Sequence, residues 1–494
     1  MNTCTKYLNK ESHLLLDSQR NGMKKYILLV LTSIFSIIIG IGFFNIIAVA
    51  IEKINRNGRT PVAENIPQPF REDGESSRVF VIKNSKNVQT KETSRADAIV
   101  GIKHIASIST SPLNDIDGSN NIINPDLISP KSVIFSDDGT KVYINALESY
   151  KTLICDAKTF KPLKTIRHTF NEQQQNLFTG TIGSTPYEQS PYFFSGKPVE
   201  STLSHNGAYL WVPYYRKSTD EYGLDASAVA VINTKTDKII RLLPSGPISK
   251  VVAISPNNTR AAVIHWGNNT LGILDISSNN PFDFYYTKHI VVDSIYEPLT
   301  TPTSRDSDCG LCLRGAIFLP DNTTLLVARM SGGGIAFIDT TSGTYLGSSL
   351  EDIQNPRDIK LSPDGNFVFI TDNNDGFVTK IPIEKLESSI QNKTIKNLHR
   401  EDFESVFVGF GARTISLSKD GSLFAIALNN DMEIALFNSK TLAEITRVKM
   451  GRYPVGIDIS PDNHYIWVTY QTKNMLGADA VDIFKIEYQD EISS

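Results

Sequence analysis

The stretch that decides the fold is LSPDGNFVFIT, residues 361–371, because close copies of it recur six more times along the chain. Each copy runs from a β-prone residue through Ser or Leu and a short Asp, Asn or Gly turn into a second β-prone run. The other copies are FSDDGTKVYIN (135–145), LSHNGAYLWVP (203–213), ISPNNTRAAVI (254–264), FLPDNTTLLVA (318–328), LSKDGSLFAIA (417–427) and ISPDNHYIWVT (459–469). One such unit cannot bury its own apolar face and must stack on its neighbours, so the copies predict a repeat fold.

The turn position of every copy carries Gly or Asn, residues that tolerate a left-handed backbone. These seven residues are Gly139, Gly207, Asn258, Asn322, Gly365, Gly421 and Asn463. In the unit that contains 361–371 we expect four strands, at 357–362, 366–371, 377–383 and 405–408. Four antiparallel strands in each of seven units are typical of a seven-bladed β-propeller, which is an all-β fold.

The last unit supplies only three strands, the third at Ala480–Tyr488, so its fourth strand must come from elsewhere. Two segments upstream of the first copy are candidates, namely Ala98–Ile105 (AIVGIKHI) and Arg78–Lys83 (RVFVIK). Either segment would close the ring of blades and remove an exposed sheet edge. We therefore expect the propeller to span residues 78–488, followed by a short tail at 489–494.

The copies resemble the YVTN-type propeller repeat, whose pattern runs P-x-x-hydrophobic-x-hydrophobic-S-P-D-G into a strand. The segments NPRDIKLSPDGNFVFITDNN (355–374) and YPVGIDISPDNHYIWVTY (453–470) match this pattern closely. The resemblance covers about residues 78–488 and implies the propeller fold. Similar propellers include lactonase-type hydrolases, d1-type haem domains of nitrite reductases, amine dehydrogenase subunits and binding modules, so the resemblance implies no single function.

Before the repeats, Tyr26–Ile51 is a run of residues without a charged side chain, longer than the ~20 residues that cross a bilayer. Lys24 and Lys25 directly precede it, which favours a cytoplasmic N-terminus. We expect a cytoplasmic tail at 1–25, a transmembrane signal-anchor at Tyr26–Ile51, a linker at 52–77, and a propeller on the periplasmic or extracellular side. A signal peptide cleaved at Ala48-Val49-Ala50 is the alternative.

Two of the four cysteines, Cys309 and Cys312, would lie on the exported side, where a disulfide is permitted. Leu313 rather than His follows Cys312, so the pair is no covalent haem site. The neighbourhood also lacks the two further ligands that zinc needs. We therefore expect a disulfide that pins a loop, and no metal site.

A mostly basic set of residues lies four positions before the hydrophobic residue that opens each copy. The members of this basic column are Lys131, Val199, Lys250, Arg314, Arg357, Arg413 and Val455. With 49 Lys and Arg in 494 residues, about 0.7 basic residue is expected at seven positions. The first strand of each blade lines the channel, and guanidinium groups match carboxylate and phosphate oxygens. The column therefore predicts an anion-binding funnel at the channel rim. The alternative is that its side chains reach water or pair with acids such as Glu200, Asp358 and Asp458.

The ends of the second strands are expected to face the same rim. The residues there are Ala146, Tyr214, His265, Arg329, Asp372, Leu428 and Tyr470. Tyr214, Arg329, Asp372 and Tyr470, with Trp266, are therefore further candidates for ligand binding. His265 is a candidate general base or iron ligand, against the alternative of a packed structural histidine. Insertions at 171–196, 215–227 and 294–313 are expected on this face, either as a lid or as neutral surface loops.

The formal net charge of −4 provides no broad basic field, so a nucleic acid partner is not expected. No Ser-His-Asp spacing, metal cluster or pair of catalytic carboxylates is recognisable, which favours a binding module without chemistry. Its partners would be the membrane, through Tyr26–Ile51, and an anionic small molecule or a partner protein at the rim. The alternatives are a lactonase-type hydrolase, with His265, Arg329 and Arg314 as candidate residues, and an oxidoreductase-like domain that holds haem or quinone. The sequence specifies no cofactor.

Overall fold

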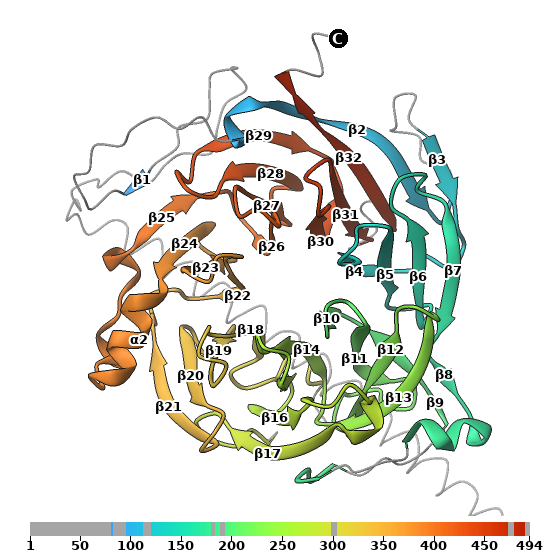
Figure 1. Cartoon of the computed structure of the whole chain (residues 1–494), viewed down its shortest axis with the longest axis vertical. Coiled ribbons are helices and arrows are strands. Elements are labelled where there is room, and N and C mark those ends of the chain that lie inside the picture. The colour runs from blue at the N-terminus through green and yellow to red at the C-terminus, as the bar shows by residue number, and fades with distance from the viewer. Residues whose placement is uncertain are drawn as a thin grey trace, which may run out of the picture. The chain divides into compact units, whose positions relative to one another are not determined.

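In the computed structural model, seven sheets surround a central opening as the blades of a propeller (Figure 1). The structure describes residues 81–82, 95–111, 120–178, 183–187, 193–297, 304–472 and 479–489. All of them belong to one unit, Ser77–Ser494. Across these residues the prediction of a seven-bladed, all-β propeller is confirmed. The predicted transmembrane segment Tyr26–Ile51 lies outside the described residues, and no helix within them is long and apolar enough to cross a membrane.

The blades are numbered 1 to 7 from the first repeat, and their strands run outward from the channel (Figure 1). The innermost strands are β4 (Pro130–Phe135), β10 (Thr202–Ser204), β14 (Ser249–Ile254), β18 (Leu313–Phe318), β22 (Pro356–Leu361), β26 (Ala412–Leu417) and β30 (Tyr453–Ile459). The second strands are β5 (Lys141–Ala146), β11 (Tyr209–Lys217), β15 (Arg260–His265), β19 (Thr324–Arg329), β23 (Phe367–Asp372), β27 (Leu423–Leu428) and β31 (Tyr465–Gln471).

The third strands are β6 (Lys151–Asp156), β12 (Ser227–Asn233), β16 (Thr270–Asp275), β20 (Ile335–Asp339), β24 (Phe377–Pro382), β28 (Glu433–Asn438) and β32 (Ala480–Tyr488). The fourth strands are β7 (Pro162–Arg167), β13 (Lys238–Ser245), β17 (Tyr285–Val291), β21 (Thr344–Ser349), β25 (Glu404–Phe407), β29 (Glu444–Lys449) and β2 (Ile99–Ser109). Further short elements are β8 (Thr169–Phe170) and β9 (Phe194–Pro198) beside blade 2, helix α2 (Ile383–Gln391), and the 3₁₀ helices η1 (Arg95–Ala98), η2 (Glu172–Phe178), η3 (Pro281–Asp283), η4 (Ile395–Asn397) and η5 (Arg400–Asp402).

The turn between the first and second strands repeats one hydrogen-bond pattern, illustrated by blade 6. The Ser418 hydroxyl donates to Asp420 Oδ1 (2.7 Å) and accepts the backbone N–H of Leu423 (2.9 Å). The same two bonds recur at Ser136, Ser255, Ser362 and Ser460. The seven predicted turn residues all have positive φ, between 57° and 80°. The repeated motif is therefore a turn whose polar groups satisfy one another locally.

Blade 7 is closed by an N-terminal strand. β2 pairs antiparallel with β32, with Ile102 opposite Ile486, and β3 (Asn120–Ile123) adds a further parallel strand outside it. Of the two predicted donors, Ala98–Ile105 is therefore confirmed. The prediction that Arg78–Lys83 could close blade 7 is wrong, because β1 (Val81–Ile82) pairs with β25 at the outer edge of blade 5. β2 is long enough to bury Ala106 and Ile108 completely in the core, which anchors it.

The core of the propeller consists of apolar layers between neighbouring blades. Between blades 5 and 6, the ring centroids of Phe369 and Phe424 lie 5.9 Å apart. Between blades 7 and 1, Trp467 packs edge-on against Phe135 at 6.0 Å. Because each blade has both apolar faces covered by its neighbours, the stacking predicted from the repeats requires the ring to close.

Candidate functional site

A β-bulge at the start of the first strand places the basic column beside the channel. In blade 6, Ala412 pairs with Leu428 and Thr414 pairs with Ala427, so Arg413 has no partner across the ladder. A bulged residue leaves the regular pleat, and its side chain is re-aimed. The ladder is interrupted in the same way at Lys131, Lys250, Arg314, Arg357 and Val455. The alignment of the copies locates the column, but nothing in it signals the bulge.

Close packing of the innermost strands accompanies these bulges. A Cβ on Gly315 would lie 2.9 Å from the Asp358 backbone of the next blade. A Cβ on Gly456 would likewise lie 3.0 Å from the Lys131 carbonyl oxygen. Glycine is therefore required at these two positions, because a larger residue would push adjacent inner strands apart.

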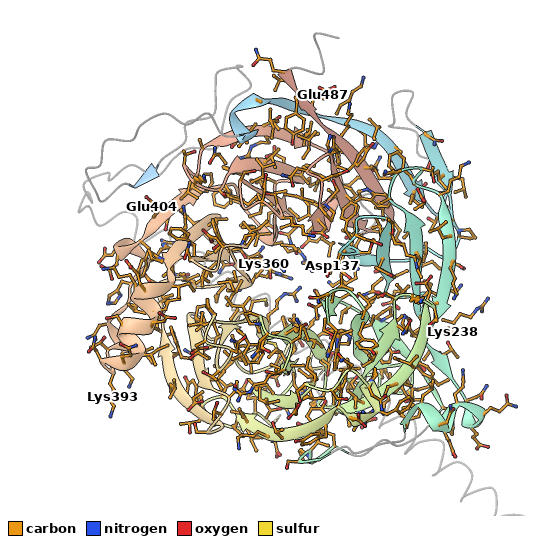
Figure 2. All side chains as sticks on the ribbon, in the orientation of Figure 1. Asp137, Lys238, Lys360, Lys393, Glu404 and Glu487 are labelled. Carbon is orange, nitrogen blue, oxygen red and sulfur yellow. A yellow bond between two sulfur atoms is a disulfide. The ribbon has the colours of Figure 1, made fainter. Side chains whose placement is uncertain are left out.

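The innermost strands enclose a cavity of about 660 Å³, within the range of small-molecule sites. At the end where these strands begin, its wall includes Lys131, Glu200, Arg314, Arg357 and Arg413. Toward the turns, its wall includes Asp137, Asp358, Asp458 and Lys360. Figure 2 shows Lys360 and Asp137 beside the central opening, whereas Lys238 lies on the outside of the propeller. The structure thus brings four of the five basic column residues to one cavity.

The column cations are withdrawn from water rather than displayed on an open rim. Lys250, Arg314 and Arg413 are only 5%, 5% and 4% exposed. Burial, followed by the charges of Arg413 and Lys250, lowers the pKa of Lys131 well below its ordinary value. Burial, followed by the charge of Arg314, also lowers the pKa of Lys250. The funnel expected at the rim is therefore a set of basic side chains withdrawn into the channel wall, of which Lys131 and Arg357 are partly exposed. The five residues Lys131, Lys250, Arg314, Arg357 and Arg413 are named here the cation band.

Glu200 is the one carboxylate among the described residues that forms an ion pair with a column cation. Its Oε1 accepts from Arg314 Nη2 at 2.7 Å. Burial alone would raise the pKa of Glu200, but the charges of Arg314, Lys250, Lys131 and Arg413 together lower it to about 2. Glu200 is therefore ionised, and it is the single carboxylate that pairs within a band of five basic side chains.

The other two acids proposed as partners of the column bind backbone groups instead. Asp458 accepts the N–H of Phe135 (2.9 Å) and the hydroxyl of Ser416 (2.7 Å). Asp358 accepts the N–H of Ile415 (3.2 Å). Both carboxylates therefore link neighbouring blades. The pairing alternative holds for Glu200 but not for Asp358 or Asp458.

Unpartnered donors remain in the cation band. Arg357 Nη1 donates to Asn373 Oδ1 at 3.3 Å, yet the Nε atoms of Arg357 and Arg413 are buried without a hydrogen-bond partner in the described structure. Burial, followed by the charge of Arg314, lowers the pKa of Arg413 to about 10. Buried N–H donors without a partner are rare in folded proteins and call for an explanation.

Aromatic rings, and no acids, contact Lys250. Its Nζ lies 3.9 Å from the ring centroid of Tyr215 and 4.9 Å from that of Trp266. The guanidinium carbon of Arg314 lies 5.7 Å from the Trp266 ring. Cation–π contacts hold these cations in place without cancelling their charge.

Two of the predicted insertions pack over these rings. The Trp266 indole N–H donates to the carbonyl of Arg305 (3.1 Å), and the N–H of Arg305 donates to the carbonyl of Tyr222 (2.8 Å). Asp306 accepts from Arg216 Nη2 (2.6 Å) and from the Tyr215 hydroxyl. Residues 215–227 and 304–312, named here the cover, therefore contact each other above Trp266.

A disulfide between Cys309 and Cys312, with Cα atoms 4.9 Å apart, lies in the cover. Both cysteines are buried in a small apolar cluster with Ile248 and Trp266. Cys312 lies two residues before Arg314, so the turn that the disulfide closes leads directly into the cation band. No group of three or more potential metal ligands occurs among the described residues.

His265 does not line the cavity described above. Its Nδ1 lies 2.9 Å from the Thr270 hydroxyl, and its ring packs against Tyr187 and His289. Burial, followed by His289, lowers its pKa well below the ordinary value, so the ring is neutral at physiological pH. His265 is therefore separate from the basic column.

The remaining candidates at the ends of the second strands also lie outside the cavity wall. Asp372 accepts the backbone N–H groups of neighbouring turn residues, and Arg329 pairs with Glu351 at 2.7 Å. The Tyr214 hydroxyl contacts His168 Nδ1 at 2.9 Å. Tyr470 is fully buried beneath Arg452. Register places these residues at the expected end of each blade, but their side chains pair with other protein groups and do not face the cavity.

Comparisons with known proteins support the fold alone. No protein-family model matches the chain, and no curated protein matches its sequence. The β-propeller domain of Cps50 (Swd1) from Myceliophteria thermophila is similar in structure, with a TM-score of 0.52 and 13% identity over 73% of this chain and 97% of that chain. Kuenenia stuttgartiensis hydrazine synthase gives a TM-score of 0.48 and 15% identity over 76% of this chain and 100% of that chain. The chain thus contains a β-propeller domain.

Proposed function

We propose that this propeller is a binding module whose central channel takes a small anionic ligand. The observation that carries the proposal is the imbalance of the cation band, where five basic side chains, three of them buried, accompany one carboxylate. Burying a charge without a partner is costly, and natural proteins pair nearly all buried charges. An anion in the cavity would neutralise the band and fill the hydrogen-bonding capacity of the arginines.

The site offers binding groups and no identified reaction. Basic side chains line the cavity, while His265, the candidate base, lies away from it and is neutral. A general base must be within hydrogen-bonding reach of the proton that it removes. Recognition of an anion is therefore the function that the geometry supports best.

Calorimetric titration of the purified propeller with phosphate tests this proposal. Replacing Arg314, Arg357 and Arg413 together by Met removes three guanidinium groups while keeping apolar volume in the wall. We expect heat of binding for the wild type and a loss of affinity of about a thousandfold or more in the triple variant, since each charged hydrogen bond contributes about 1.5–3 kcal/mol.

Lys238→Met provides the matched control, because this exposed lysine lies on the outside of blade 2 (Figure 2). It removes a positive charge without touching the channel and should leave the affinity for phosphate unchanged. Circular dichroism of all variants checks that the propeller remains folded. Phosphate binding that survives the triple substitution in a folded protein would refute the proposal.

We propose in addition that Tyr26–Ile51 anchors the propeller in a membrane, with the propeller on the periplasmic or extracellular side. The uncharged run and the preceding Lys24 and Lys25 support this arrangement. Alkaline extraction of membranes should leave the full-length chain in the pellet. Protease added to the propeller side of intact cells or spheroplasts should digest the propeller. Recovery of the full-length chain in the soluble fraction would contradict the anchor.

A further inference from the structure

The most informative group in the cation band is its single acid. Glu200 belongs to blade 2, whereas Arg314 belongs to blade 4, so the ion pair between them bypasses blade 3. Glu200 follows Val199, the first of the two uncharged members of the column. The carboxylate therefore comes from blade 2, whose own position in the basic column is the uncharged Val199.

Glu200 accepts a hydrogen bond from only one arginine of the cation band. One of its oxygens accepts from Arg314, and the other is buried without a hydrogen-bond partner in the described structure. Arg413, in blade 6, is 4% exposed and keeps an unpartnered Nε. Arg357, in the neighbouring blade 5, keeps an unpartnered Nε as well. Two adjacent guanidinium groups thus retain donors that Glu200 does not occupy.

The basic groups that have no carboxylate partner determine which charge of ligand the cavity favours. At the end of the cavity where the inner strands begin, Arg314 is paired with Glu200, whereas Arg357 and Arg413 have no carboxylate partner among the described residues. A monoanion would neutralise one of these two guanidinium groups, whereas a ligand with two or three negative charges would neutralise both. Because opposite charges in a poorly hydrated site attract strongly, affinity should rise steeply with the charge of the ligand.

We infer that the channel selects small polyanions over monoanions, and that Glu200 limits this selectivity by occupying the place of one ligand carboxylate. This inference rests on the proposed anion-binding function. The shared chemistry of the ligand is a compact set of two or more anionic oxygens, as in phosphate esters and polycarboxylates. Glu200 lowers the affinity for every anion, and the loss is greatest for the most highly charged one.

Calorimetric titrations at neutral pH with acetate, phosphate and citrate test the inference on the wild-type protein. We expect phosphate and citrate to bind about tenfold or more tightly than acetate. A preference between phosphate and citrate then distinguishes a phosphate-type from a carboxylate-type ligand. Acetate binding as tightly as both would overturn the inference and leave the anion-binding function standing. Failure of all three anions to bind would overturn the function itself.

Glu200→Gln removes the negative charge and keeps a carbonyl oxygen that can accept from Arg314. We expect the affinity for citrate to rise about tenfold and that for acetate to rise less. Glu221→Gln is the matched control, because Glu221 is an exposed glutamate of the cover. It should leave both affinities unchanged. A weaker citrate complex in folded Glu200→Gln would show that Glu200 positions Arg314 for the ligand, and would overturn its role as a stand-in carboxylate.

Discussion

The two ends of the channel carry repeated polar residues of opposite character. At the turn end, Ser418 and Asp420 bind each other and the adjacent backbone, and four other blades repeat the arrangement. At the opposite end, Arg357 and Arg413 retain buried donors without partners. Both sets recur with the repeat, so recurrence alone does not separate them. Local satisfaction marks the turns as structural, and its absence marks the cation band as a candidate site.

The strongest test of this contrast is Arg413→Met. We expect the affinity for phosphate to fall about a hundredfold, because a charged hydrogen bond and a central cation are lost. The free energy of unfolding should stay the same or increase, since a buried cation without a carboxylate partner is removed. Titration calorimetry and urea denaturation measure the two effects. A less stable protein with unchanged phosphate binding would make Arg413 a structural residue like those of the turns.

Ser418→Ala probes the turn end. The substitution leaves the N–H of Leu423 and the carboxylate of Asp420 without the buried Ser418 hydroxyl. We expect a loss of about 1–3 kcal/mol in the free energy of unfolding, and phosphate affinity within about twofold of the wild type. Ser388→Ala, at an exposed position of α2, should cost less than about 0.5 kcal/mol. Equal effects of the two serine variants would contradict a structural role for the turn network.

The affinity for an anion should depend on pH, because the end of the channel with the basic column contains two lysines that titrate. Because the pKa values of Lys131 and Lys250 are lowered, both are charged at low pH and lose their protons at a lower pH than an ordinary lysine. Sulfate affinity should therefore fall, by about tenfold, as the pH rises through these lowered pKa values toward the ordinary value of about 10.4. Sulfate keeps its charge over this range, so the protein alone titrates.

The stability of the free protein should change in the opposite direction over the same range. Between the lowered pKa values and about 10.4 the unfolded chain binds more protons than the folded chain, so these two lysines increase the free energy of unfolding as the pH rises. Calorimetry and urea denaturation at several pH values measure both trends. Replacement of Lys131 and Lys250 by Met should flatten the sulfate profile, and a profile that keeps its slope would exclude these lysines as its cause.

The smallest effect is expected for Lys360→Met. Lys360 lines the same cavity and lies beside the central opening, but it is outside the bulges and its side chain is 45% exposed (Figure 2). Its contact with Asp358 at 3.7 Å is a weak, solvated ion pair. Phosphate affinity should change by less than about threefold, as titration calorimetry can establish. An effect as large as that of Arg413→Met would move the ligand toward the turn end.

The sequence by itself determined the seven blades, their turns and the position of the basic column. These features depend on interactions over a few residues, such as the positive φ of Gly421 and the short apolar run Leu423–Leu428, which is buried throughout. Features of this kind can therefore be recognised in the amino-acid sequence. The bulge at Arg413 escaped prediction because it depends on how two strands pair and not on the residue itself.

Only the tertiary structure decided which N-terminal segment closes blade 7, and which polar residues share the channel. His265 and Asp372 have the register expected of rim residues, yet neither side chain lines the cavity. Glu200 reaches Arg314, more than a hundred residues later in the chain, and leaves Arg413 without an acid. The environment of a buried charge is set by groups that folding brings together, so it cannot be read from neighbours in the sequence.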